Sequence, residues 1–299
     1  MGVTVANISW LNVDRTQFID QIVKNSNLLS TFTLVDGVKS KVSIPVYDAS
    51  IVWQQDKCTF DPQSTASIDE KEMTVEEWNW AFVNCKQTLE NTYRSVLLRQ
   101  GQLNEETLDA EFESWLMTYF GKKVQEKVML QAATELIDAI ENGPDAADVV
   151  PFTISAVTSS TILDNLEAGY LAMEGDLLDA MHGAADREYM PTIYMNAKAV
   201  QAYQIAIAGL YTQSPQGIEE GRIPPYFGMN IQLFSSLPDD HIIITYPANL
   251  VMLTDDYNDT NAIDSEYVRK THSLHLFGAF KLGFNFKNAA HLLYGTVEA

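Results

Sequence analysis

The chain has 299 residues, of which 40 are Asp or Glu and 19 are Lys or Arg, so its formal net charge is −21 and its sequence pI is about 4.4. This balance argues against a nucleic-acid-binding surface, because phosphate contacts need Lys and Arg, and against electrostatic attachment to an anionic membrane. The hydrophobic fraction of 46% is that of a folded protein, and no apolar run reaches transmembrane length.

The first third of the chain predicts an arm, strands and a projecting hairpin. Residues 1–31 form a mixed arm with one short amphipathic helix. Apolar residues then alternate roughly, as in strands, at Phe32, Leu34, Val42, Ile44, Val46 and Val52. The polar segment 54–71 predicts a long hairpin, and residues 74–85 return as a strand whose aromatic side should face the core: Trp78, Trp80 and Phe82. A projecting hairpin is a liability in a monomer, so we expect a partner to cover it.

The longest predicted element is a helix over residues 104–142, after a shorter one over 88–100. Asn104 can cap its start, and Gly143 followed by Pro144 stops it. Its apolar stripe steps by four residues and winds slowly around the helix: Leu116, Phe120, Val124, Val128, Ala132, Leu136 and Ile140. At ~1.5 Å per residue the helix would be ~55 Å long. It is either the core of a helical bundle or a spine that carries sheets, with Gly121 as a place where it could bend.

The rest of the chain alternates between short strands and helices and closes with a long strand. An acidic linker over 144–148 leads into strands at 149–154, 192–195, 229–233, 241–246 and 250–253. Helices run from a cap at Ser159 or Ser160 to Gly183, and from a cap at Asn196 to Leu210. After an acidic loop over 255–264, residues 274–286 alternate for ~43 Å at ~3.3 Å per residue. This ribbon matches the long helix in length, which favours the spine interpretation.

No motif for catalysis, cofactor binding or metal binding is present, so we predict no catalytic residues, no cofactor and no metal site. His272 and His275 would lie on opposite faces of a strand and cannot easily share a metal. The loop 255–264 has the composition of a calcium site, with Glu266 near its twelfth position. Tyr257 at its third position and Thr260 at its sixth break the EF-hand pattern, so we interpret it as a solvated turn.

The remaining candidate residues also have simple interpretations. Glu219–Glu220 and Asp239–Asp240 are predicted to be exposed loop charges. Cys58 and Cys85 form neither a disulfide framework nor a zinc motif, so both are expected to be free thiols in a chain made in a reducing cytoplasm.

Three patches of sequence resemble one known family when they are taken in order. They are Pro191–Asn196 followed by a helix, Gly228–Pro238, and Leu253–Asp259 with the alternating ribbon that ends at Leu292–Gly295. Their order resembles that of the major capsid proteins of tailed bacteriophages, which share the Hong Kong ninety-seven type capsid fold with encapsulin shells. The resemblance covers nearly the whole chain.

The resemblance implies an α+β fold with five parts. These are an N-terminal arm (1–31), an extended hairpin loop (32–75), a peripheral domain with the spine helix (76–148), a mixed α/β axial domain (149–260) and a closing β-ribbon that returns to the peripheral domain (261–299). It also implies a structural, non-enzymatic subunit that assembles as pentamers and hexamers into an icosahedral head around double-stranded DNA. The implied partners are a portal and a scaffolding or decoration protein, and the implied location is the virion, assembled in the host cytoplasm.

The sequence shows one departure from the family, and it leaves open one feature of some relatives and two alternative functions. Many relatives carry a cleaved N-terminal scaffolding segment, whereas Met1 stands just before the arm, so we expect any scaffold to be a separate protein. Some relatives crosslink subunits through Lys and Asn; candidates occur here, but nothing in the sequence pairs them: Lys57, Lys71, Asn285 and Asn288. The alternatives are an encapsulin-like compartment for cargo enzymes and a soluble enzyme with an unrecognised carboxylate site.

Overall fold

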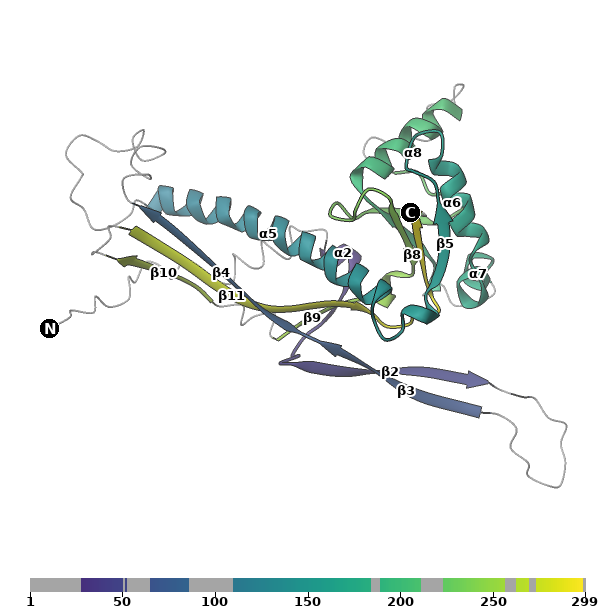
Figure 1. The fold of residues 1–299 in the computed structure, drawn as a ribbon, viewed down its shortest axis with the longest axis horizontal. Coiled ribbons are helices and arrows are strands. Elements are labelled where there is room, and N and C mark those ends of the chain that lie inside the picture. The colour runs from purple at the N-terminus through teal and green to yellow at the C-terminus, as the bar shows by residue number, and fades with distance from the viewer. Residues whose placement is uncertain are drawn as a thin grey trace.

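The computed structural model describes residues 28–50, 52, 65–85, 110–183, 189–210, 223–255, 262–268 and 273–297. Figure 1 shows an elongated α+β molecule, as predicted: a long helix lies along a narrow sheet, a compact α/β body sits at one end, and a two-stranded hairpin projects past the body. The predicted N-terminal arm helix and the predicted helix over 88–100 lie outside the described residues.

The narrow sheet, called the ribbon sheet below, is built around the predicted closing strand. This strand, β11 (Ser273–Phe286), pairs antiparallel with β4 (Glu76–Cys85), β9 (Leu250–Thr254) and β10 (Ala262–Val268). A short strand after the helix α2 (Leu28–Thr31), β1 (Thr33–Val35), pairs parallel with β9. The predicted apolar face of β11 is confirmed where its side chains are described, because Leu282, Phe284 and Phe286 are buried.

The long helix is α5 (Ala110–Glu141), and it runs without interruption through Gly121. Its 32 residues span ~48 Å and the 14 residues of β11 span ~46 Å, so the predicted match in length holds. The predicted start at residues 104–109 lies outside the described residues. No helix in the described part of the chain is long and apolar enough to cross a membrane.

The winding apolar stripe of α5 contacts different neighbours along the helix. Near its start Phe120 packs on Phe82, with ring centroids 4.3 Å apart. Farther along, buried stripe residues join a core with the apolar face of β11: Val128, Ala132, Leu136 and Ile140. The side chain of Glu135 also accepts a hydrogen bond from the backbone N–H of Phe284, at 3.0 Å. The helix is therefore a spine on the ribbon sheet and not the centre of a bundle.

The aromatic side of β4 is less buried than predicted. Trp78 and Trp80 are half-buried, and Phe82 keeps 36% of its surface exposed. Phe82 packs on Phe120 of α5, whereas Trp80 lies against β11 within its own sheet. Gly278 of β11 lets the Trp80 ring lie flat against the strand, since a Cβ at residue 278 would stand 2.5 Å from Trp80 Nε1.

The compact body consists of one sheet, called the compact sheet below, and three helices. The strand order of the compact sheet is β5-β12-β8-β6-β7. Its strands are β5 (Val150–Ile154), β6 (Thr192–Met195), β7 (Asn230–Leu233), β8 (His241–Thr245) and β12 (Leu292–Val297). Its helices are α6 (Ile162–Leu171), α7 (Gly175–Met181) and α8 (Ala197–Leu210). The predicted cap of α8 is confirmed, because the side-chain oxygen of Asn196 accepts a hydrogen bond from the N–H of Ala199 at 2.8 Å.

Sheet membership does not follow chain order. The strand β9, which belongs to the predicted axial segment 149–260, lies in the ribbon sheet, and β12, from the predicted closing segment 261–299, lies in the compact sheet between β5 and β8. The division of the chain into five domains stays a prediction.

The helix predicted to end at Gly183 is in fact two helices. α6 ends at Leu171 and α7 begins at Gly175, whose φ of +57° favours glycine. Between them the chain turns so that Met173, 3% exposed, enters the core of the compact body. The predicted cap at Ser159 or Ser160 is also wrong: α6 follows Thr161, whose hydroxyl donates to the carbonyl of Ala156 at 2.6 Å.

The predicted acidic loop 255–264 is shorter than expected. Ala262 to Asp264 already belong to β10 and pair with Ala279 to Phe277, because the free edge of β11 offers backbone partners. At the other end of the loop, Asp255 forms an ion pair with Lys281 at 3.3 Å. Residues 256–261 lie outside the described part of the chain.

Candidate functional site: the crossings between the two sheets

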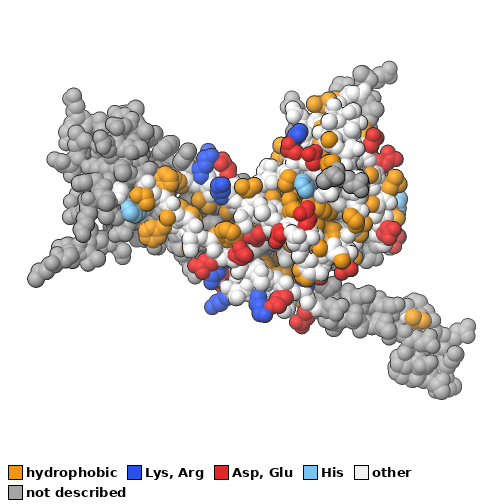
Figure 2. All heavy atoms as spheres, in the orientation of Figure 1, with side chains coloured by type: hydrophobic (Ala, Val, Ile, Leu, Met, Phe, Trp, Pro, Cys, Tyr) orange, Lys and Arg blue, Asp and Glu red, His pale blue; other side chains and the backbone are white. Residues whose placement is uncertain are grey.

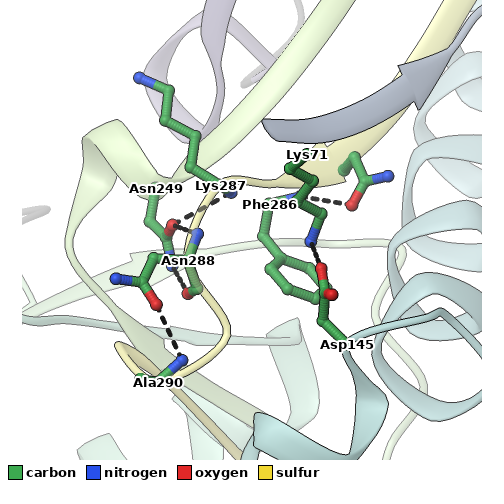
Figure 3. A network of polar contacts seen from close by, with 8 residues as sticks. Lys71, Asp145, Asn249, Phe286, Lys287, Asn288 and Ala290 are labelled. Atoms are coloured by element: carbon green, nitrogen blue, oxygen red, sulfur yellow. Dashed lines mark hydrogen bonds and ion pairs between the residues drawn. The ribbon is translucent and has the colours of Figure 1, made fainter. Parts of the chain in front are cut away.

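Three segments carry the chain between α5 and the ribbon sheet on one side and the compact sheet on the other. They are 142–149 between α5 and β5, 246–249 between β8 and β9, and 287–291 between β11 and β12. The first contains the 3-10 helix η3 (Ala146–Asp148) and the second contains η6 (Pro247–Asn249). Figure 3 shows two groups of polar contacts at these segments: Asn249 of the second binds residues of the third, and Asp145 of the first binds Lys71 of the hairpin.

Asn249 is the centre of this network. It is fully buried, and its side-chain oxygen accepts hydrogen bonds from the backbone N–H groups of Lys287 at 3.1 Å and Asn288 at 2.8 Å. Its side-chain amide donates to Thr245 Oγ1 and to the carbonyl of Asn288, both at 2.9 Å. One side chain thus connects the second crossing to the third, and it donates two hydrogen bonds and accepts two, which is its full capacity.

A lysine from the hairpin reaches the first crossing. Lys71 belongs to β3 (Thr65–Thr74), and its side chain is only 8% exposed. Its Nζ lies 2.7 Å from Asp145 Oδ2 and 3.4 Å from the centre of the Phe286 ring, so the cation is paired and also stacked over an aromatic face (Figure 3). Burial lowers the pKa of Lys71, and the hydrogen bond and charge of Asp145 oppose that shift. The contact connects the hairpin to the start of the compact body and to the end of β11.

Removing Asp145 is expected to destabilise the protein more than replacing Lys71 by Met. Asp145→Ala leaves a buried ammonium without its carboxylate, whereas Lys71→Met keeps an apolar stem over Phe286 and removes the cation. Because the Asp145 side chain is 36% exposed, we expect a difference of about 1 kcal/mol in the free energy of unfolding. Denaturant titration measures it, and equal losses would contradict the proposed importance of the pair.

The pH dependence offers a check on the same pair. The pKa of Lys71 is lower in the folded protein than in the unfolded chain, so the unfolded chain binds more protons between the lowered value and 10.5. The free energy of unfolding of the wild-type protein should therefore rise with pH across that window. Lys71→Met should lack this contribution.

Beyond Lys71 the strands of the hairpin pair only with each other among the described strands. Its strands, β2 (Lys41–Ser50) and β3, pair over ten residues in the register Lys41↔Thr74 to Ser50↔Thr65. Its base is fixed to the ribbon sheet, since Met73 is buried with Val251 and Leu253. Figure 1 shows the rest of the hairpin projecting away from both sheets.

A third polar connection joins the end of α5 to the compact sheet. The hydroxyl of Tyr294 on β12 donates to Glu141 Oε1 at 2.9 Å, and it lies 2.6 Å from Nδ1 of His241 on β8. Since its only proton goes to Glu141, the hydroxyl accepts a hydrogen bond from His241. Burial, followed by the hydrogen bond and charge of Glu141, raises the pKa of Tyr294, so the residue stays a neutral donor.

Few of the residues singled out in the sequence belong to this network. Lys57, Glu219–Glu220 and His272 lie outside the described residues, as does the side chain of Cys85. Asn285 accepts a hydrogen bond from the N–H of Phe286, and Asn288 caps the turn at the N–H of Ala290. Neither is paired with Lys71, whose partner Asp145 was not predicted.

The other candidates have structural contacts. His275 Nε2 lies 2.9 Å from Ser273 Oγ. Asp239 is exposed as predicted, but it binds Lys198 at 2.8 Å and Asn196 at 2.7 Å, while Asp240 accepts a hydrogen bond from the N–H of Val157. Within the described ranges, no three His, Cys, Asp or Glu side chains are arranged to hold a metal ion.

No protein-family model matches the sequence, and no curated protein sequence matches it. Solved structures do match along nearly the whole chain. A chain of the satellite phage P4 procapsid, in a structure that includes the size determination protein, is 12% identical with a TM-score of 0.63, and the match covers 99% of this chain and 92% of that one. A chain of the capsid of a native GTA particle is 12% identical with a TM-score of 0.57, and the match covers 100% of this chain and 94% of that one. A chain of a virus-like particle from Pyrococcus furiosus is 12% identical with a TM-score of 0.50, and the match covers 95% of this chain and 97% of that one. The chain therefore has the Hong Kong ninety-seven type capsid fold, as its sequence predicts.

Proposed function

We propose that this chain is a major capsid protein that assembles as pentamers and hexamers into the icosahedral head of a tailed bacteriophage. The observation that carries the proposal is the hairpin: its base is fixed by Met73 and Lys71, while its outer strands pair only with each other among the described elements. A two-stranded hairpin is only marginally stable in water, and its exposed strand edges can pair with another chain. A neighbouring subunit that covers the hairpin would therefore stabilise it. The likeness to capsid chains over the whole length supports the same conclusion.

The charge of the chain fits the contents of such a shell. A net charge of −21 keeps the wall from binding packaged double-stranded DNA tightly. The partners in this proposal are further copies of the chain, a portal, and a separate scaffolding or decoration protein. The protein would act in the virion without catalysis, after assembly in the host cytoplasm.

Expression of the chain alone, followed by electron microscopy, tests the proposal. Closed shells or rings of five and six subunits are expected, and a compact monomer under all assembly conditions would contradict it. The likeness to the Pyrococcus furiosus particle favours a second candidate, an encapsulin-like compartment. Co-purifying protein cargo would favour the compartment, whereas packaged DNA would favour the phage head.

Deleting residues 56–67, at the outer end of the hairpin, should leave a folded subunit that does not assemble. The deletion spares the base, because Met73 and Lys71 stay in place. Circular dichroism would report the fold and sedimentation would report assembly. Normal shells from the deleted chain would show that the hairpin is not an assembly element.

A further inference from the structure

The tight turn after residue 225 holds a bulky side chain in an unfavourable backbone conformation. Tyr226 and Met229 exchange backbone hydrogen bonds of 3.0 and 2.9 Å, and the two residues between them have positive φ: +45° at Phe227 and +87° at Gly228. Two-residue turns with positive φ at both positions favour Asn and Gly, and a bulky residue there is an outlier. The stability of the turn alone therefore does not explain a phenylalanine at this position.

The surrounding structure fixes the turn and displays the ring. The hydroxyl of Tyr226 donates to the carbonyl of Leu163 on α6 at 3.2 Å. The ring of Phe227 stacks on Tyr170 with centroids 4.9 Å apart and an interplanar angle of 29°. Even so, 61% of Phe227 is exposed, and Leu171, the residue that follows Tyr170 on α6, is 73% exposed. We call Tyr170, Leu171, Tyr226 and Phe227 the aromatic platform. Strained residues held in place by surrounding contacts are found mostly at functional sites.

Two acidic side chains lie near the Tyr226 end of the aromatic platform. Asp164 and Glu167 are exposed on α6, the helix that carries Tyr170 and Leu171. Their charges act on the platform: burial, followed by the charges of Glu167 and Asp164, raises the pKa of Tyr226. A partner that fits the platform therefore combines apolar surface with positive charge.

The chain presents that combination on the outer face of α5. Lys122, Lys123 and Lys127 are exposed there, and Leu130 one turn farther on is 49% exposed. We call these four residues the lysine face. It points away from the ribbon sheet because the opposite stripe of α5 is buried on β11, and Figure 2 shows the Lys side chains gathered over this helix. Glu126 lies among them and pairs with Lys123 at 2.7 Å, so the run 122–127 holds three lysines and one carboxylate, a net charge of +2 in a chain of net charge −21.

The two surfaces cannot meet within one subunit. In Figure 1, α6 lies on the outer side of the compact body, whereas the middle of α5 lies along the ribbon sheet. We propose that the aromatic platform of one copy binds the lysine face of a second copy. Phe227 and Leu171 would contact Leu130 and the lysine stems, and the ammonium groups would lie among Asp164, Glu167 and the aromatic rings. Because the two surfaces differ, the contact is head-to-tail and can close into a ring. The inference rests on the proposed function.

Replacing Phe227 by Gly separates strain from binding. Glycine adopts the positive φ freely, so the melting temperature of Phe227→Gly should equal or exceed that of the wild type, while the yield of shells or rings should fall about tenfold or more, as for a central interface residue. Phe227→Tyr keeps the ring and is the matched control, with near-normal assembly. Normal assembly of Phe227→Gly would overturn the proposal.

Charge reversal on both surfaces tests whether the lysine face is what binds the aromatic platform. Asp164→Lys with Glu167→Lys should block assembly, as should Lys122→Glu, Lys123→Glu and Lys127→Glu together, and the chain with all five changes should assemble again. If each set blocks assembly and the chain with all five changes folds but still does not assemble, the proposed pairing of the two surfaces is contradicted. If the Lys variants of α6 fail to fold, Asp164→Asn with Glu167→Gln should still weaken assembly and its salt dependence. Failure of the wild-type chain to assemble would instead count against the proposed function.

Discussion

Asn249→Ala is expected to lower the free energy of unfolding by about 3 kcal/mol. The substitution removes two acceptor contacts and two donor contacts at a fully buried position, and it leaves the N–H of Asn288 without its partner. The N–H of Lys287 keeps a second acceptor, the backbone carbonyl of Asn249, which limits the loss. Denaturant titration at constant m-value measures the effect.

Asn142→Ala is the matched control for this change. Asn142 also donates a side-chain hydrogen bond, to Asp138 at 2.9 Å, but it is exposed at the end of α5. We expect a change within about 0.5 kcal/mol. If Asn249→Ala were equally mild, water or a rearranged turn would replace the network, and the crossings would not depend on it.

Leu136→Ala is expected to have an effect of similar size, about 3 kcal/mol, for a different reason. Leu136 is fully buried in the core between α5 and the ribbon sheet, so truncation removes apolar contacts and leaves a cavity. Leu130→Ala on the same helix is the control, because 49% of Leu130 is exposed. A loss below 1 kcal/mol for Leu136→Ala would show that the spine and the ribbon can repack.

Elements with long, uninterrupted periodicity were predictable from the sequence. The stripe of α5 and the alternation of β11 each continue over many residues, so their type and their matched lengths follow from spacing alone. The break between α6 and α7 was not predictable in this way, because Met173 and Leu177 are both buried and continue the helical apolar pattern through it. Gly175 was the local signal for the break.

The polar network was not predictable because its partners are distant in sequence. Nothing near Lys71 indicates that Asp145 will lie beside it, since the contact requires the hairpin, η3 and β11 to be in place together. Asn249 looks in the sequence like an ordinary turn residue between two strands. Its importance depends on the second crossing being covered by the third.

The order of strands in the two sheets also has a consequence for synthesis of the chain. β1 pairs with residues 251–253, β4 with residues 273–282, and β5 with residues 293–297. In a growing chain these three strands lack their partners until residues 251–297 have been made, whereas β2 and β3 can already pair with each other, and contacts over such separations form slowly. Until then neither sheet is complete and the spine lacks its ribbon. A chain that stops short of residue 273 therefore lacks the strands that pair with β4 and β5, and the buried stripe of α5 lacks the apolar face of β11.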